Sequence, residues 1–196
     1  MRHCLGVSLF YVPHEKIQHF FIAFLLILAV FLCGCTRENP LPRAEQGFLD
    51  LTQWSLETNG IVHLDGEWEF YWNRLLFPDD FKTPVRPEKT GFFAIPGFWN
   101  GDEADGEILK GEGYATFRLK VMLKPDQGTL AVRLENQATS YRLWVNNELI
   151  LWNGVVGTDR DAAKPQYLVR ISDIDQERHD LEFILQVSNF SLSPSP

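Results

Sequence analysis

From Phe48 onward, apolar and polar residues alternate with a period of two rather than 3.6. In Tyr114–Leu123, for example, Leu119 falls on one side of an extended backbone and Arg118 on the other. The same pattern predicts further strands at 66–72, 92–95, 129–135, 140–145, 148–152, 166–171 and 180–190. Strands that bury only one face are typical of antiparallel sheets. The chain is therefore predicted to be all-β, with an antiparallel β-sandwich or jelly roll as its fold.

Turn signals separate these strands. Asn146-Asn147 lies between two of them, and asparagine tolerates positive φ, so this pair predicts a two-residue hairpin turn. Pro96-Gly97 predicts another turn, in which the glycine can adopt positive φ. Only 73–77 and 174–179 look even briefly helical. Four apolar residues in the strands are interpreted as core: Trp68, Phe70, Phe117 and Leu143.

The composition fits one globular domain and excludes one class of partner. Apolar residues make up 45% of the 196 residues, and aromatic residues make up 13%, which favours a well-packed core or a surface that faces sugars or peptides. Acidic residues outnumber basic ones by 26 to 18, for a net charge of −8. A chain of this charge repels the phosphate backbone, so no nucleic acid is expected as a partner.

The first 35 residues look like an export signal. Fourteen consecutive apolar residues, Phe20–Cys33, follow the basic residues Arg2 and Lys16. A membrane-spanning helix needs about 20 such residues, so this run has the size of a signal-peptide core. The residues Leu32–Cys35 resemble the bacterial lipobox, which implies that Cys35 becomes the lipidated first residue of the mature chain. The alternative is an uncleaved signal anchor, and either one holds the exported part at the periplasmic or extracellular face of a membrane.

The chain then divides into four parts. Residues 1–35 are the signal peptide with its lipobox-like end, 36–47 a polar tether, 48–190 the sandwich domain and 191–196 a C-terminal tail. All three cysteines, at positions 4, 33 and 35, fall in the first part. The exported domain therefore has no disulfide and must be stabilised by its core alone.

Six short strings, read in order, carry a family resemblance. They are Leu64–Trp72 (LDGEWEFYW), Ile95–Asn100 (IPGFWN), Gly113–Leu119 (GYATFRL), Tyr141–Asn146 (YRLWVN), Asn153–Gly157 (NGVVG) and Val187–Phe190 (VSNF). The set resembles the N-terminal extracytoplasmic domain of bacterial seven-transmembrane receptors with diverse intracellular signalling modules. It is similar, more loosely, to the sugar-binding domain of glycoside hydrolase family 2. The resemblance covers about residues 54–190 and implies a galactose-binding-like jelly roll that serves signal transduction.

Catalytic and cofactor motifs are absent from the sequence after Cys35. That part has two histidines, His63 and His179, and no metal-binding His-Glu-x-x-His helix, nucleophile elbow or phosphate-binding glycine loop. No pair of carboxylates can be assigned the roles that a glycosidase needs. We therefore expect a non-catalytic domain without a cofactor. The acidic loop 101–107 departs from the EF-hand spacing and is interpreted as a solvated turn, although structural calcium, which is common in galactose-binding-like folds, stays open.

Two places offer side chains for a small ligand, and a carbohydrate is the expected one because sugar sites combine aromatic rings with planar polar groups. Trp99 and Asn100 follow a turn and, with Tyr114, flank the loop 101–113. The resemblance favours this loop end, because jelly rolls of this class bind ligands there. Arg142 and Trp144 form the second place, on the strand face opposite the buried side chains. For Trp144 the alternative is a ring covered by a loop or stacked under an arginine.

Two functional hypotheses follow. In the first, the chain is an exported sensory domain that binds a carbohydrate or another small ligand and works with a membrane signalling protein. In the second, it is a structural or protein-interaction sandwich with no small ligand. Receptors of the resembled family continue into seven hydrophobic helices, whereas this sequence stops at Pro196. The chain is therefore expected to be either a truncated receptor or a free-standing lipoprotein.

Overall fold

The computed structural model describes residues 41–104, 106–125, 127–135, 139–174 and 179–190. Within these ranges strands dominate, beside one short α-helix and one 3-10 helix. The elements are β1 (Phe48–Leu51), α2 (Leu56–Asn59), β2 (Gly66–Trp72), the 3-10 helix η1 (Pro78–Lys82), β3 (Gly91–Ile95), β4 (Glu103–Ala104), β5 (Glu107–Ile108), β6 (Gly113–Leu123), β7 (Leu130–Leu134), β8 (Ser140–Val145), β9 (Glu148–Asn153), β10 (Arg170–Ile174) and β11 (Asp180–Asn189). The predicted export segment, Cys35, the first part of the tether and the tail 191–196 lie outside the described residues.

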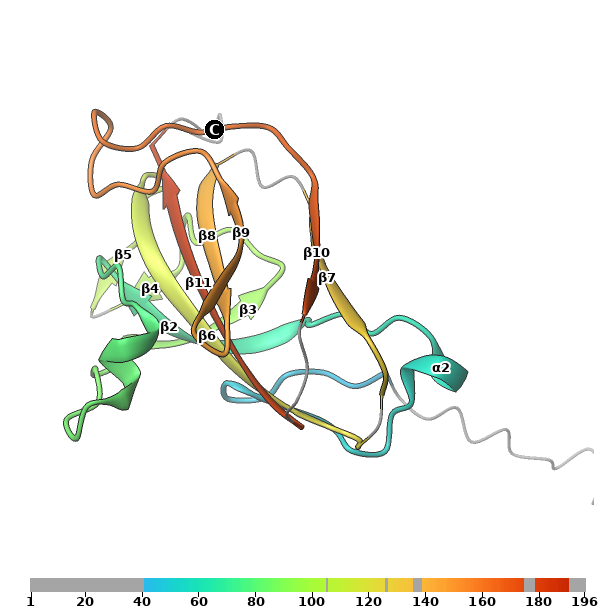
Figure 1. The fold of residues 1–196 in the computed structure, drawn as a ribbon. Coiled ribbons are helices and arrows are strands. Elements are labelled where there is room, and N and C mark those ends of the chain that lie inside the picture. The colour runs from blue at the N-terminus through green and yellow to red at the C-terminus, as the bar shows by residue number, and fades with distance from the viewer. Residues whose placement is uncertain (1–40, 105, 126, 136–138, 175–178, 191–196) are drawn as a thin grey trace, which may run out of the picture. The chain divides into compact units, whose positions relative to one another are not determined.

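Seven strands form one sheet in the order β3-β2-β6-β11-β8-β9, with β1 as an additional partner of β6 (Figure 1). Neighbouring strands are antiparallel, except that β1 runs parallel to β6. The longest pairing joins β6 to β11, from Asp180 opposite Met122 to Asn189 opposite Gly113. These two strands are therefore the centre of the sheet.

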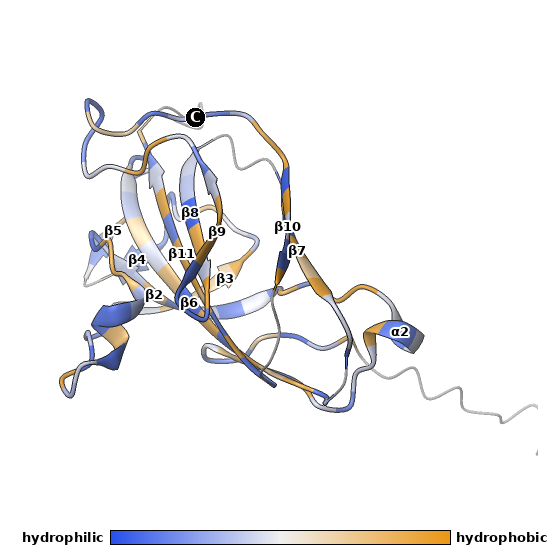
Figure 2. Cartoon of the chain, in the orientation of Figure 1, coloured by the Kyte–Doolittle hydropathy of each residue, from blue (hydrophilic) through white to orange (hydrophobic). Residues whose placement is uncertain are grey.

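A second layer packs on this sheet and makes the fold a sandwich. Its strands β7 and β10 form an antiparallel pair, and β10 lies beside β9 (Figure 1). Leu130 of β7 and Ile174 of β10 belong to the same buried cluster as Val121 and Phe183 of the large sheet. The alternation of apolar and polar residues behind this packing is visible along the strands in Figure 2. The all-β antiparallel sandwich predicted from the sequence is confirmed.

Aromatic rings fill one half of the core between the layers. The ring of Phe70 lies 5.3 Å from that of Phe117 and 5.4 Å from that of Phe93, measured between centroids. Such ring pairs contribute about 0.5–1.5 kcal/mol each beyond the burial of their area. Trp68 and Leu143 are buried in the same cluster, so all four residues that the sequence assigned to the core lie there.

The opposite face of the large sheet is largely covered as well. Tyr71, Trp144 and Ile184 point to this face and form a second buried cluster with Phe81 of η1. The segment before η1 is held on the sheet by Thr116, whose hydroxyl donates to the carbonyl of Arg74 at 2.8 Å. The face that alternation alone predicts to be solvated is therefore a second, smaller core.

The turns confirm one prediction and correct another. Asn146 and Asn147 both have positive φ, 47° and 79°, and join β8 to β9 as expected of a two-residue hairpin turn. Gly97 does not have positive φ, contrary to expectation. Glycine is needed there for space, because a Cβ would lie 2.5 Å from the carbonyl oxygen of Ala94.

Three predicted segments differ from the structure. Residues 73–77 are not helical, and the helical turn begins at Pro78 instead. The strand expected at 166–171 begins only at Arg170 and runs to Ile174, because its pairing with β7 sets its limits. The acidic loop that was interpreted as a turn contains the short hairpin β4–β5.

The folded domain begins before the predicted boundary at residue 48. The backbone N–H of Ala44 donates to the carbonyl of Asp65 at 2.8 Å, and that of Gly47 donates to the carbonyl of Glu67 at 2.8 Å. Ala44 is buried in the main core. The last residues of the expected tether therefore belong to the sandwich, held by backbone hydrogen bonds that composition does not reveal.

Candidate functional site

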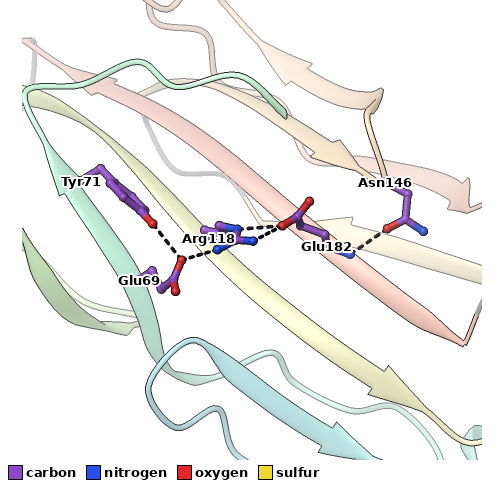
Figure 3. A network of polar contacts seen from close by, with 5 residues as sticks. All are labelled: Glu69, Tyr71, Arg118, Asn146 and Glu182. Atoms are coloured by element: carbon purple, nitrogen blue, oxygen red, sulfur yellow. Dashed lines mark hydrogen bonds and ion pairs between the residues drawn. The ribbon is translucent and has the colours of Figure 1, made fainter. Parts of the chain in front are cut away.

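A buried guanidinium links the three central strands on the outer face of the large sheet (Figure 3). Arg118 lies in the middle of β6 and is only 5% exposed. Its Nη1 donates to Oε2 of Glu69 on β2 at 2.8 Å, and its Nε donates to Oε1 of Glu182 on β11 at 2.7 Å. The ring of Phe81 lies 4.6 Å from the guanidinium carbon. The cation is thus neutralised by two carboxylates and covered by an aromatic ring.

Two further residues extend this network. The Tyr71 hydroxyl donates to Oε2 of Glu69 at 2.9 Å, and the backbone N–H of Glu182 donates to Oδ1 of Asn146 at 2.8 Å (Figure 3). Burial lowers the pKa of Arg118, but the hydrogen bonds and charges of the two glutamates outweigh it and raise that pKa. Burial, reinforced by the negative charge of Glu69, raises the pKa of Tyr71 above its usual range. Both carboxylates are engaged by one guanidinium, so the network acts as a structural lock between strands.

The three residues predicted at the loop end do not form one surface. Trp99 is buried in the core, where its ring lies 5.4 Å from that of Trp72 and 6.4 Å from that of Phe117. Its Nε1 donates to the carbonyl of Gly111 at 3.1 Å. Asn100 is exposed, and Tyr114 is half-buried. The expectation that Trp99 offers a ring for stacking is wrong, because its ring packs against other rings of the core and is not exposed to a ligand.

The second predicted pair, Arg142 and Trp144, lies on the outer face of β8. Trp144 is buried, and the ring of Phe77 meets it edge-on at a centroid distance of 5.6 Å. Of the two interpretations of Trp144, the structure supports the ring covered by a loop. Arg142 is half-buried and forms no ion pair with any residue that the structure describes. It is the one member of this pair that a ligand can reach.

An exposed indole beside Arg142 was not predicted. Trp152 on the edge strand β9 lies opposite Arg142 in the pairing of β8 with β9 and is 48% exposed. The guanidinium carbon of Arg170, the first residue of β10, lies 5.2 Å from the centroid of the indole ring. Trp152 is therefore flanked by cations from two strands, while about half of its surface remains open to solvent.

Polar groups without partners lie next to this edge. Asn153 and Tyr141 face each other on β9 and β8, and both side chains are fully buried. Four buried side-chain atoms in this part of the described chain accept or donate no hydrogen bond: Oγ1 of Thr139, the hydroxyl oxygen of Tyr141, Oδ1 of Asn153 and Nε of Arg170. Burial raises the pKa of Tyr141, and the charge of Arg170 opposes that rise. Tyr141 and Asn153 lie on the face of the sheet opposite to Arg142 and Trp152, so a ligand on the indole contacts the arginines and not these two buried groups.

We define the β9–β10 site as the exposed indole and its two flanking cations, Arg142, Trp152 and Arg170. Sequence reasoning named only Arg142 among them. The segment 148–153 reads ELILWN, in which consecutive apolar residues hide the face that each side chain takes. The exposure of Trp152 follows from the position of β9 at the edge of the sheet. The one available signal was the lone tryptophan in the last strand of a hairpin.

The described residues contain no group of three or more histidine, cysteine, aspartate or glutamate side chains that could hold a metal ion. Among the helices that the structure describes, none has the length and apolar character that crossing a membrane requires.

No protein-family model matches the chain, and no curated protein matches it. The solved structures to which it is similar include three β-glucuronidases. The Faecalibacterium prausnitzii enzyme is 18% identical over 65% of this chain and 20% of its own, with a TM-score of 0.48. The Ruminococcus gnavus enzyme is 12% identical over 64% and 20%, with a TM-score of 0.48. The Bifidobacterium dentium enzyme, complexed with coumarin-3-O-glucuronide, is 18% identical over 64% and 19%, with a TM-score of 0.46. The chain spans about a fifth of the length of these enzymes.

Proposed function

We propose that this chain is an exported, non-catalytic domain that binds a carbohydrate at the β9–β10 site. The observation that carries the proposal is the combination of a half-exposed indole with two guanidinium groups, Arg142 on β8 and Arg170 on β10. An indole face stacks on the apolar face of a sugar ring, and planar polar groups bind its hydroxyls. The ordered strings that resemble the extracytoplasmic domain of seven-transmembrane receptors support a sensory role, in a receptor or in a lipoprotein that carries the same domain.

Titration calorimetry on the full chain in detergent tests the binding. Neutral and acidic monosaccharides are titrated into the native protein, into Trp152→Ala and into Phe92→Ala. Phe92 is the matched control, because it lies on β3, the opposite edge of the sheet, is 39% exposed and also has a cation over its ring, Lys89 at 4.9 Å. We expect Trp152→Ala to weaken binding by about 1 kcal/mol, or roughly fivefold, and Phe92→Ala to leave it unchanged.

Two outcomes would contradict this placement. Equal weakening by both substitutions would mean that exposed rings bind sugars non-specifically. If none of the sugars binds, the chain does not bind carbohydrate. The latter outcome favours the alternative function, a protein-interaction domain. That alternative rests on a run of exposed apolar side chains just before and within β10, namely Tyr167, Leu168, Val169 and Ile171. Exposed apolar runs of this kind are typical of contact surfaces between proteins.

The non-catalytic part of the proposal has its own test. Glu69 and Glu182, the two carboxylates of the central network, both accept hydrogen bonds from Arg118, so neither is held ready for proton transfer. We expect no release of chromophore from aryl glycosides by the purified protein. Turnover that one carboxylate-to-amide substitution abolishes would overturn this expectation.

A further inference from the structure

Two arginines beside Trp152 have no acidic partner among the described residues. The described chain contains several ion-paired arginines: Arg118 pairs with Glu69 and Glu182, and Arg133 pairs with Glu135 at 2.9 Å. Arg142 and Arg170, by contrast, form no ion pair with a described residue. Both are half-buried, and the Nε of Arg170 is cut off from solvent without a hydrogen bond. A guanidinium in this situation lacks the compensation that Arg118 receives.

The residues that pair with Arg142 across the sheet do not supply that compensation. In strand register, Arg142 lies opposite Trp152 on one side and opposite Gln186 on the other. Gln186 in turn lies opposite Thr116, so this row of the sheet carries no carboxylate across four strands. Gln186 is itself buried, and its Oε1 has no hydrogen-bond partner. The positive charge is local, since the chain as a whole carries a net charge of −8.

The two Nη groups of Arg170 donate no hydrogen bond to a described residue, unlike the Nη groups of Arg118, whereas its Nε is buried. A guanidinium that stacks on an indole uses its flat face, and its N–H groups point outward in the plane. Those N–H groups match the two oxygens of a carboxylate, and charge-assisted hydrogen bonds of this kind are roughly twice as strong as neutral ones. A neutral hydroxyl supplies one acceptor and no charge. The unpaired cations therefore distinguish between acidic and neutral sugars.

We propose that the ligand of the β9–β10 site is a sugar acid whose carboxylate is bound by Arg170 and Arg142 while its ring packs against Trp152. This inference rests on the proposed function, because it names the class of carbohydrate that the same site takes. No covalent step is involved.

The test compares matched ligand pairs on the full chain in detergent by titration calorimetry. Glucuronate and galacturonate are measured against glucose and galactose, with acetate and inorganic phosphate as simple anions. The proteins are the native chain, Arg170→Gln, Arg142→Gln and the control Arg133→Gln. Arg133 lies on β7, the strand paired to β10, and its side chain is 60% exposed. Thermal melting of each variant shows whether it is folded.

We expect the native chain to bind a uronate at least tenfold more tightly than its neutral counterpart. Arg170→Gln and Arg142→Gln should each reduce this ratio severalfold while neutral-sugar affinity stays within twofold, and Arg133→Gln should leave the ratio unchanged. Arg170→Lys, which keeps the charge and loses the planar fork, should retain part of the preference.

Each of the other outcomes contradicts a particular part of the proposal. Equal affinity for the uronate and the neutral sugar would contradict the preference for sugar acids and would still support carbohydrate binding at the site. A preference that survives both glutamine variants places the carboxylate elsewhere. If acetate or phosphate binds as tightly as the uronate, the site binds simple anions and does not recognise the sugar ring. Binding of neither sugar nor anion contradicts the proposed function itself.

Discussion

Phe98 and Trp99 are adjacent in the sequence, yet their rings lie in opposite environments. Phe98 is 89% exposed, and Trp99 is 8% exposed among the rings of Trp72 and Phe117. Both are aromatic, follow the same turn and differ only in the side to which the backbone directs them. Two adjacent aromatic residues at this turn can therefore differ completely in exposure.

The first prediction compares these two residues. Trp99→Ala removes a core ring and its hydrogen bond to Gly111, so we expect the free energy of unfolding to fall by about 3–5 kcal/mol. Phe98→Ala should change it by less than about 0.5 kcal/mol, because little of the ring is buried. Urea denaturation of both variants measures the difference. Similar losses for the two would place Phe98 in a contact that the structure does not show.

The second prediction concerns the Tyr71 hydroxyl and alkaline pH. An unfolded tyrosine loses its proton near pH 10, whereas burial and Glu69 raise the pKa of folded Tyr71. Folding then retains a proton that the unfolded chain releases, so this stabilisation is complete below about pH 10 and is lost as pH rises toward the folded pKa. Between pH 9 and pH 11 we expect unfolding free energy to fall by about 1 kcal/mol more in the native chain than in Tyr71→Phe. Parallel pH profiles would contradict the raised pKa.

At the scale of elements, the loop between β9 and β10 is closed on itself. The backbone groups of Val155 and Lys164 exchange two hydrogen bonds, of 2.8 and 2.9 Å. The side-chain amide of Asn153 donates to the carbonyl of Gln166 at 2.6 Å. Gly154 lies inside this closure at φ +66°, and a Cβ there would lie 2.0 Å from the carbonyl oxygen of Lys164. These contacts hold the loop that leads from β9 to Arg170 at the start of β10.

The third prediction tests that closure with two glycines of similar φ. Gly154→Ala must displace the backbone of Lys164, so we expect a loss of at least about 2 kcal/mol in unfolding free energy. Gly101 has φ +91° and nothing within 4 Å of its missing Cβ, so Gly101→Ala should cost only about 1–2 kcal/mol from its backbone conformation, less than Gly154→Ala. Chemical denaturation distinguishes them. A Gly154→Ala variant no less stable than Gly101→Ala would mean that the loop is free to shift.

At the scale of the whole molecule, the export prediction concerns residues outside the described structure. If Cys35 is the lipidated first residue, Cys35→Ser should release the protein from the membrane or leave its leader uncleaved. Stable attachment needs at least two acyl chains, because a single chain binds only marginally. Membrane fractionation and mass spectrometry of the mature protein test this fourth prediction. An intact Met1 on the membrane-bound native chain would instead support the uncleaved signal anchor.

The sequence by itself determined the class of the fold and most of its strands. The period-two pattern at 114–123, 140–145 and 180–190 corresponds to β6, β8 and β11, and Asn146-Asn147 forms the predicted hairpin turn. These features are local: the face that a side chain takes and the φ that a residue tolerates are set within a few residues. The sequence therefore predicts correctly those strands and turns that neighbouring residues determine.

Tertiary structure alone decided which faces and rings remain open. Trp144 and Trp99 are buried, whereas Trp152 is half-exposed, although all three stand in or beside strands. The difference arises from contacts between residues far apart in the chain: Phe77 covers Trp144, and Trp152 lies on β9, the last strand in the order of the large sheet as far as the structure describes it. The pairing of Arg170 with Trp152 depends on a layer that packs across the core. Alternation predicts two faces for every strand, and only the packing of distant segments determines which of them a ligand can reach.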